Sequence, residues 1–274
     1  MKELYEEIFL TLGKKANTLN YLVTYFEDYT DCESNLPTPT IPINFSKFHN
    51  LKLLKIYNYY LRFENQIQSS CYKNLRTLQV NYIQISTTIC VIKNCEGHLR
   101  KILVNSYDKS DNYYEESLLL IRTVYEYCPL VEYLSLSFPK STIHFVEFEK
   151  LLKACLNLKS LLLKINCYYH DAKSREKASL EIGKELSRIL IKSAPDNLRE
   201  IRLTDTNKIK FSLETLDAFL DNWRGRTPLS IIISDPLYKK EEYMEILNKY
   251  MDDGVIKEFK IGYSACWSYL SFED

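Results

Sequence analysis

One short phrase, L-x-x-L-x-L with aliphatic or phenylalanine substitutions, recurs along most of this 274-residue chain. Apolar residues are common enough for some matches to arise by chance, so the spacing of the copies matters more than their number. Successive copies begin 24 to 40 residues apart, which leaves room for one strand and one helix in each unit. The pattern therefore predicts a repeat architecture. The copies are Leu51, Leu54, Ile56; Leu75, Leu78, Val80; Leu99, Ile102, Val104; Val131, Leu134, Leu136; Leu158, Leu161, Leu163; Leu198, Ile201, Leu203; and Ile256, Phe259, Ile261, with weaker ones starting at Leu19 and Leu229.

A cysteine accompanies the phrase in four copies, three or four residues before its first apolar position. These are Cys71, Cys95, Cys128 and Cys155. The chain has 8 cysteines, too few for the disulfide framework of a small secreted domain. We therefore expect reduced and mostly buried thiols that mark one structural slot of the repeat.

Between the phrases, the period of the apolar residues changes from two residues to about 3.6 residues, which predicts amphipathic helices. Ser212 is expected to cap the start of one of them, and Gly225 and Gly254 are expected to follow helix ends. The predicted helical segments are 116–129, 145–157, 180–195, 212–225 and 241–254.

Glycine is scarce, with 6 residues in the chain, and the closest pair is Gly254 and Gly262. This spacing excludes the dinucleotide-binding GxGxxG turn, the GxxxxGK phosphate loop and the GxSxG nucleophile elbow. Lysine plus arginine and aspartate plus glutamate number 36 each, so no net charge favours nucleic acid or an anionic membrane. We expect neither as a partner.

The N-terminal stretch does not read as a secretory signal, because Glu3, Glu6 and Glu7 stand where a cationic and then apolar sequence is needed. No run approaches 18 apolar residues. We expect a soluble protein of the cytoplasm or nucleus.

An enzyme is the less favoured alternative. Cys90, Cys95 and His98 have a spacing that offers three zinc ligands without a fourth. In the competing interpretation, Cys90 faces the core from a helix and Cys95 lies at the end of that helix. A thiol nucleophile at Cys128 or Cys155 is possible in principle, but both residues are explained by their repeat slot. We expect no catalytic residue, no metal and no cofactor.

The phrases CPLVEYLSLSF, residues 128–138, and CLNLKSLLLKI, residues 155–165, resemble the cysteine-containing class of leucine-rich repeats. Longer runs such as LIRTVYEYCPLVEYLSLSF, SAPDNLREIRL and FLDNWRGRTPLSIIIS are similar to the leucine-rich-repeat regions of an expanded family of fungal F-box proteins. The repeat resemblance covers about residues 15 to 265.

This resemblance implies an α/β solenoid with a curved parallel sheet on its concave side and helices on its convex side. It also implies the function of a non-enzymatic substrate-recognition part of an F-box-type ubiquitin ligase adaptor. Residues 3–12 are only faintly similar to an F-box, so binding of a ligase linker subunit is expected only if an F-box lies upstream. A free-standing repeat scaffold or inhibitor without a ubiquitin role is the alternative.

The expected organisation is a single leucine-rich-repeat domain over residues 1–274. Residues 1–18 are expected to form an N-terminal capping helix, residues 19–262 irregular repeats, and residues 263–274 a C-terminal cap. Asn166 fits the asparagine position of regular repeats, whereas other residue types occupy its equivalents. An irregular solenoid follows from this departure.

Because side chains alternate along a strand, residues two, four and six positions after the first leucine are predicted to lie on the concave face. We predict a protein substrate there or at rim loops expected at 107–117 and 167–179. The interpretation without function is that these residues form an ordinary solvated face. The candidate partner-binding residues are Tyr57, Gln79, Asn81, Asn105, Tyr133, Ser135, Lys164 and Arg202.

Overall fold

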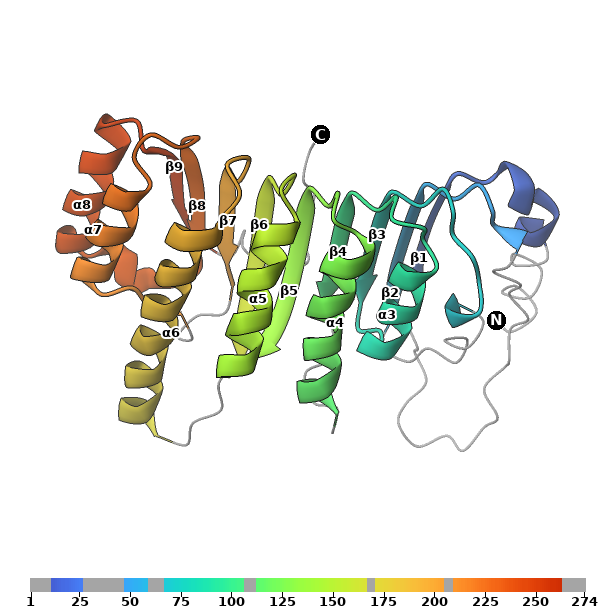
Figure 1. The fold of residues 1–274 in the computed structure, drawn as a ribbon, viewed down its shortest axis with the longest axis horizontal. Coiled ribbons are helices and arrows are strands. Elements are labelled where there is room, and N and C mark those ends of the chain that lie inside the picture. The colour runs from blue at the N-terminus through green and yellow to red at the C-terminus, as the bar shows by residue number, and fades with distance from the viewer. Residues whose placement is uncertain are drawn as a thin grey trace. The chain divides into compact units, whose positions relative to one another are not determined.

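The computed structural model describes residues 11–26, 47–58, 67–105, 112–166, 171–204 and 209–262. The chain divides into two compact units, residues 1–130 and 131–274. In each unit, strands alternate with helices, and each strand pairs in parallel with the next strand in sequence (Figure 1). The predicted α/β class is confirmed. The expectation of one domain over residues 1–274 stays a prediction.

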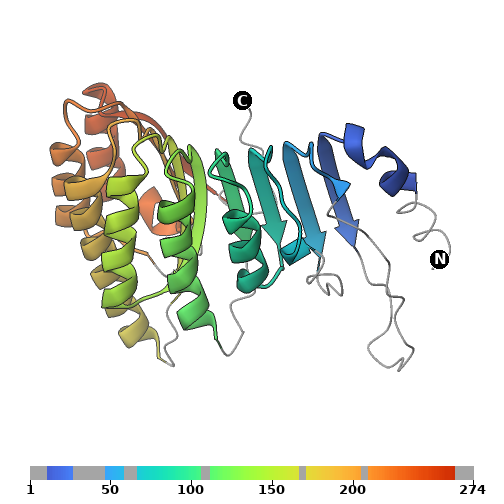
Figure 2. The ribbon, with the colours of Figure 1, turned by 45° about the vertical axis from the view of Figure 1, so that its right-hand side comes forward.

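Unit 1 contains a parallel sheet with the order β1-β2-β3-β4. Its described helices α3 and α4 pack side by side on one face of that sheet (Figure 2). Residues 11–15, within the expected capping helix, are helical, whereas residues 1–10 lie outside the described residues. The elements are η1 (Ala16–Thr18), β1 (Tyr21–Phe26), β2 (Leu53–Asn58), β3 (Thr77–Asn81), α3 (Ile85–Lys93), β4 (Lys101–Asn105) and α4 (Tyr113–Tyr127).

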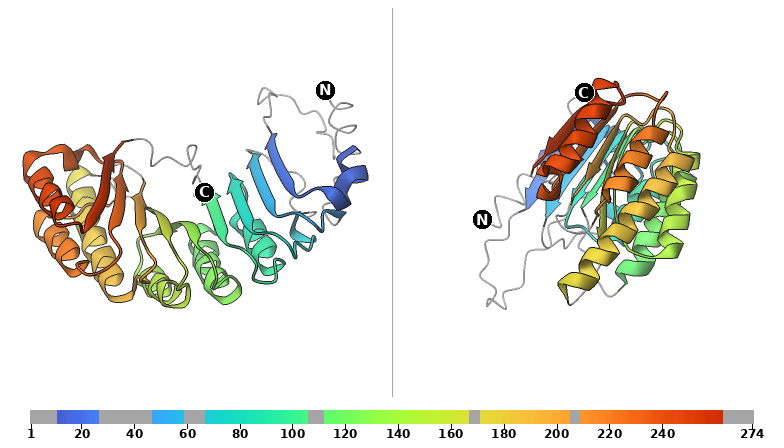
Figure 3. Two further views of the ribbon diagram at one scale, coloured as in Figure 1. Left: turned by 90° about the horizontal axis from the view of Figure 1, so that it is seen from above. Right: turned by 90° about the vertical axis from the view of Figure 1, so that its left-hand side faces the viewer.

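Unit 2 contains a parallel sheet with the order β5-β6-β7-β8-β9. Helices α5 to α8 pack in sequence on one face of it (Figure 3). The expected C-terminal cap, residues 263–274, lies outside the described residues. The elements are β5 (Tyr133–Pro139), α5 (Thr142–Ala154), β6 (Ser160–Asn166), α6 (Ala172–Ser193), β7 (Glu200–Leu203), α7 (Leu213–Asn222), β8 (Leu229–Ile233), η3 (Pro236–Lys239), α8 (Glu241–Asp252) and β9 (Ile256–Ile261).

The strand register follows the recurring phrase. Leu54 of β2 pairs with Leu78 of β3, which pairs with Ile102 of β4. In unit 2, Leu134 of β5 pairs with Leu161 of β6. All five side chains are fully buried, so equivalent positions stack into one core row in each unit. A slip of one residue would turn these rows to the other face, which explains why the apolar pattern determines the register.

The copy predicted to start at Leu229 is displaced by one residue, and the prediction is wrong there. Ile231 pairs with Ile201 of the preceding copy, which places Pro228 rather than Leu229 at the first position. Leu229 nevertheless pairs with Ile256, and an irregularity between Leu229 and Ser230 takes up the offset. One extra residue in a strand has this effect because it shifts the pairing by one position.

Helix ends agree with the predicted caps, with one large exception. The Ser212 hydroxyl accepts a hydrogen bond from Thr215 N–H at 3.2 Å, and Gly254 follows α8 with a φ of +70°. Helix α6, however, begins at Ala172, eight residues before the predicted start. Asp171 accepts a hydrogen bond from Ser174 N–H at 2.8 Å and caps this earlier start. Much of the rim loop predicted at 167–179 is therefore helix.

A buried residue three positions before the phrase recurs where the chain turns into a strand. Tyr72, Cys128 and Cys155 occupy this slot and are inaccessible to solvent. The carbonyl of Tyr72 accepts a hydrogen bond from Leu75 N–H, and that of Cys155 from Leu158 N–H, at 3.0 and 3.1 Å. This position thus requires a side chain that can be buried, and both cysteine and tyrosine occupy it.

An irregular segment, Ile209–Ser212, is fixed between α6 and the helices that follow it. Lys210 N–H donates to Ser179 O of α6 at 3.1 Å. Phe211 N–H donates to the Tyr238 hydroxyl at 3.0 Å, and Phe211 O accepts from the Tyr243 hydroxyl at 2.9 Å. Burial of these polar groups is tolerated because each is hydrogen-bonded. The segment reaches α6 at Gly183, where a Cβ atom would lie 1.9 Å from Lys210 O.

Glu149 links α5 to α6 by ion pairs. Its carboxylate lies 2.6 Å from Lys153 Nζ and 2.9 Å from Lys192 Nζ. Hydrogen bonds from these two lysines lower the pKa of Glu149 from its ordinary value to about 2. The carboxylate therefore stays charged through most of the acidic range.

This network predicts a pH-dependent cost for Glu149→Gln. We expect a loss of about 1 kcal/mol of unfolding free energy at pH 7, the upper range for a partly exposed ion pair. Because the folded pKa lies below the unfolded value of about 4.3, the stabilisation is present above pH 4.3 and is lost as the pH falls toward 2. Urea unfolding at pH 7 and pH 2.5 measures it. Glu245→Gln is the exposed control, and an equal loss at both pH values would contradict the assignment.

Candidate partner-binding face

The candidate site lies on the face of each sheet opposite the described helices, which we call the opposite face. Its side chains come from alternate strand positions, in register from strand to strand. In unit 1, Tyr57 pairs with Asn81, and Asn81 pairs with Asn105. The structure therefore places three of the four predicted unit 1 residues in one row.

The unit 1 residues differ in accessibility. Tyr57 and Asn105 are half-buried, whereas Gln79 and Asn81 are 2% and 6% exposed. The Gln79 Nε2 amide donates to the Tyr57 hydroxyl at 2.6 Å. Gln79 and Asn81 are therefore buried, and the alternative interpretation of an ordinary solvated face does not apply to these two residues.

In unit 2, Ser135 of β5 pairs with Leu162 of β6, which pairs with Arg202 of β7, so these three residues lie in one row. Ser135 and Leu162 are inaccessible to solvent, so Ser135 offers no free hydroxyl at the surface. Tyr133 and Lys164 are half-buried. Of the four predicted unit 2 residues, Ser135 is thus the one that is fully buried.

Arg202 is engaged by its own strand. Its Nε and Nη2 atoms donate to the two carboxylate oxygens of Glu200 at 2.8 and 3.2 Å, and Ser160 Oγ donates to Glu200 Oε1 at 2.5 Å. The Arg202 side chain is 11% exposed. Such a bidentate pair fixes the guanidinium geometry. A partner carboxylate would have to compete with Glu200 for this arginine.

The rim loops predicted at 107–117 and 167–179 contain five tyrosines, of which Tyr113 and Tyr114 begin α4. Tyr113 is buried, as packing on its own helix requires, and Tyr114 is 40% exposed. Tyr107, Tyr168 and Tyr169 lie outside the described residues.

A ladder of asparagines that sequence reasoning missed joins neighbouring turns. Asn50 Nδ2 donates to Asn17 O, Asn74 Nδ2 to His49 O, and Asn197 Nδ2 to Leu156 O, at 2.5, 3.0 and 2.9 Å. The available signal was the dipeptide Asn-Leu at the start of the phrase, at 50–51, 74–75, 157–158 and 197–198. Asn166, the expected ladder position, instead donates from Nδ2 to Ser137 Oγ at 3.2 Å.

The suspected zinc ligands do not converge. Cys95 is buried two residues after the end of α3, and its thiol donates to Val91 O at 2.9 Å. Cys90 is half-buried, and His98 is exposed. Among the described residues, no three histidine, cysteine or acidic side chains lie close enough to bind a metal ion.

The described cysteines form no disulfide. Of the four cysteines that precede the repeated phrase, Cys95, Cys128 and Cys155 are buried as expected, whereas Cys71 is exposed. Desolvation raises the pKa of Cys95 far above its ordinary value and that of Cys128 to about 12. Both thiols are therefore protonated at neutral pH, whereas a cysteine nucleophile acts as a thiolate.

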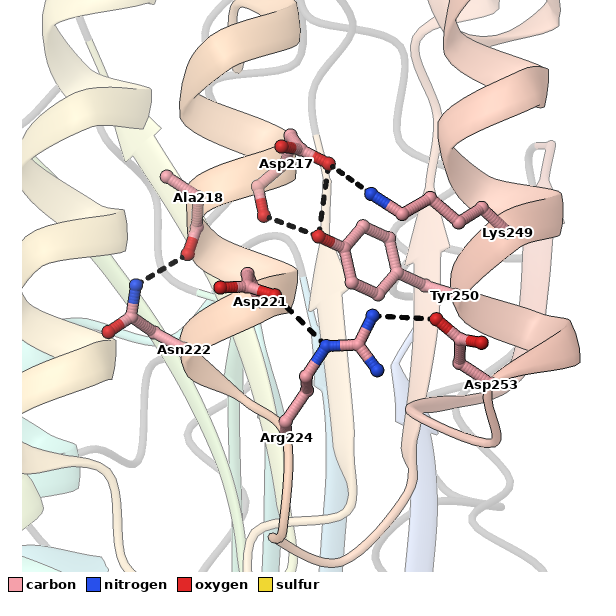
Figure 4. Close-up of polar contacts among 8 residues, drawn as sticks. All are labelled: Asp217, Ala218, Asp221, Asn222, Arg224, Lys249, Tyr250 and Asp253. Atoms are coloured by element: carbon pink, nitrogen blue, oxygen red, sulfur yellow. Dashed lines mark hydrogen bonds and ion pairs between the residues drawn. The ribbon is translucent and has the colours of Figure 1, made fainter.

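A dense polar cluster joins α7 to α8 on the helix side of unit 2 (Figure 4). Arg224 donates from Nε to Asp221 and from Nη2 to Asp253, at 2.9 and 2.6 Å, and its guanidinium lies 5.0 Å from the Tyr250 ring centroid. The Tyr250 hydroxyl lies 3.0 Å from Asp217 Oδ1. Each charged group shown there has a partner inside the cluster, which indicates a structural connection between the two helices.

No model of a known protein family matches this chain, and no curated protein matches it significantly. The described helices include none that is long and apolar enough to span a membrane.

Proposed function

We propose that both units consist of leucine-rich repeats and that the chain is a non-enzymatic protein-interaction module. The observation that carries this proposal is the strand register. Equivalent positions of the phrase pair from β1 to β4 and from β5 to β9, with one irregularity at β8. Within each unit, stacked repeats present equivalent side chains at a regular spacing, which suits extended contact with a protein.

Site-specific photo-crosslinking tests the module. A photoreactive phenylalanine analogue at Tyr57 or Tyr133 reports on the opposite face, and one at Leu119, 45% exposed on α4, is the matched control on the helix side. We expect specific protein adducts from the two tyrosine positions and not from Leu119. Adducts confined to Leu119, or no adduct at any of the three positions, would overturn the proposal.

We further propose that the module selects substrates for an F-box-type ubiquitin ligase. This part rests on the resemblance of runs such as residues 193–203 to F-box-associated repeats. Depletion of the chain should then raise the level and lengthen the lifetime of the protein crosslinked at Tyr57 or Tyr133. An unchanged lifetime would reject the ligase role and leave a free-standing scaffold or inhibitor.

A further inference from the structure

Strand β1 is the first strand of the unit 1 sheet and pairs with β2 along one side (Figure 2). Leu53 N–H of β2 donates to Asn20 O at 3.1 Å, so the even-numbered residues of β1 direct their backbone groups toward β2. Successive residues of a strand direct these groups to alternate sides. The N–H and C=O groups of Tyr21 and Val23 therefore point away from the sheet, and we call this side the outer edge of β1.

The outer edge of β1 has no partner within the part of unit 1 that the structure describes. There, β1 pairs with β2 alone, and no hydrogen bond between described residues reaches the outward backbone groups of Tyr21 and Val23. Their side chains lie on the opposite face and are 65% and 47% exposed. An unpaired edge with apolar side chains is a template for pairing with another strand.

β1 also lacks the features that usually protect such an edge, namely charged side chains, proline and irregular pairing. Its sequence, YLVTYF, contains no charged residue and no proline, and its register with β2 is continuous. β9, the last strand of the unit 2 sheet, differs because it carries Lys257, Glu258 and Lys260. The contrast indicates that β9 is protected against strand pairing and that β1 is not.

We infer that β1 pairs with β1 of a second copy of this chain, so that the protein forms a twofold-symmetric dimer through this edge. Only another extended backbone offers N–H and C=O groups at the spacing of alternate strand residues, about 6.6 Å. β1 itself supplies such a backbone. A twofold axis uses the same edge of both copies, so the assembly closes at two chains.

An antiparallel arrangement satisfies the outward groups of both copies. When the axis passes between the two Leu22 residues, Tyr21 of each copy faces Val23 of the other, and the outward N–H and C=O groups of both residues are paired. Each contact joins an aromatic to a β-branched side chain, a combination that stabilises antiparallel pairs. The chain has 36 basic and 36 acidic residues, so no net charge repels the second copy.

Sedimentation equilibrium of the full chain over a roughly hundredfold range of concentration tests the dimer. We expect a reversible change from 32.4 kDa to twice that mass. Val23→Pro removes one outward N–H and leaves the bonds to β2 in place, since an edge strand tolerates proline where the N–H faces away from the sheet. Two hydrogen bonds are lost per dimer, so the dissociation constant should rise about tenfold or more.

A second variant and a matched control separate the edge from a general change of surface. Val23→Lys should also weaken the dimer, because it places a charge at the edge. Val146, on α5 of unit 2, is 48% exposed, and Val146→Lys should dimerise like the wild type. A photoreactive phenylalanine analogue at Tyr21 should join two copies covalently.

Three results would overturn the inference: a monomer at every concentration, undiminished dimerisation of both Val23 variants, or assembly beyond a dimer. If a Val23 variant fails to fold, Tyr21→Lys replaces it, and unchanged dimerisation would again reject the edge. Crosslinks from Tyr21 to a different protein and not to a second copy would reject self-pairing. The interaction module is independent of this outcome, because it is tested at Tyr57 and Tyr133 on the opposite face.

Discussion

Replacing Gly183 by alanine is expected to destabilise the protein by about 3 kcal/mol or more, the upper range for overpacking. Helix propensity alone predicts the opposite sign, a gain of about 1 kcal/mol, because Gly183 lies inside α6. The reason is contact with the irregular segment: the added Cβ would lie 1.9 Å from Lys210 O and 2.6 Å from Lys210 C. These are backbone atoms, held by the bond from Lys210 N–H to Ser179 O at 3.1 Å.

Urea unfolding measures this effect, with Gly13→Ala as its control. Gly13 also lies in a helical stretch, and nothing comes within 4 Å of the Cβ position there. The control should be neutral or slightly stabilising, as propensity predicts. A Gly183→Ala protein as stable as the wild type would show that α6 and the segment at Lys210 are not packed this closely.

Truncation of Trp223 to alanine is expected to cost about 3–5 kcal/mol, as for other large buried aromatic residues. Trp223 is 1% exposed and follows α7. Its ring lies 5.4 Å from the Phe219 ring centroid, and the Arg226 guanidinium lies 4.7 Å above it. The indole N–H also donates to Thr227 O at 3.1 Å, so the side chain closes the turn that leads toward β8.

Two further variants separate these contributions. Trp223→Phe keeps an aromatic ring and removes the hydrogen bond to Thr227 O, so a smaller loss of about 1–2 kcal/mol is expected. Leu156→Ala removes a side chain that is 62% exposed and should change stability by less than about 0.5 kcal/mol. Chemical denaturation followed by circular dichroism measures all three variants. Equal losses for Trp223→Ala and Leu156→Ala would contradict the burial of the indole.

The candidate site was predictable in part. Alternation along each strand predicts that Tyr57, Asn81 and Asn105 share one row, and their pairing confirms it. Alternation cannot predict which of these side chains is covered, because coverage depends on the neighbouring strands. The engagement of Arg202 by Glu200 was likewise not anticipated. Alternation places both residues on the same face of β7, but it does not determine whether their side chains adopt conformations that pair.

The sequence by itself determined the order of strands and helices and nearly all of the register. Within each unit, each strand pairs with the next one along the chain, and the apolar rows can be buried only when equivalent leucines stack. The tertiary structure decided contacts between more distant segments, such as Gly183 with Lys210 and Asn197 with Leu156. The physical reason is that periodicity encodes which face of an element is buried. The atoms that meet on that face depend on how the elements approach one another.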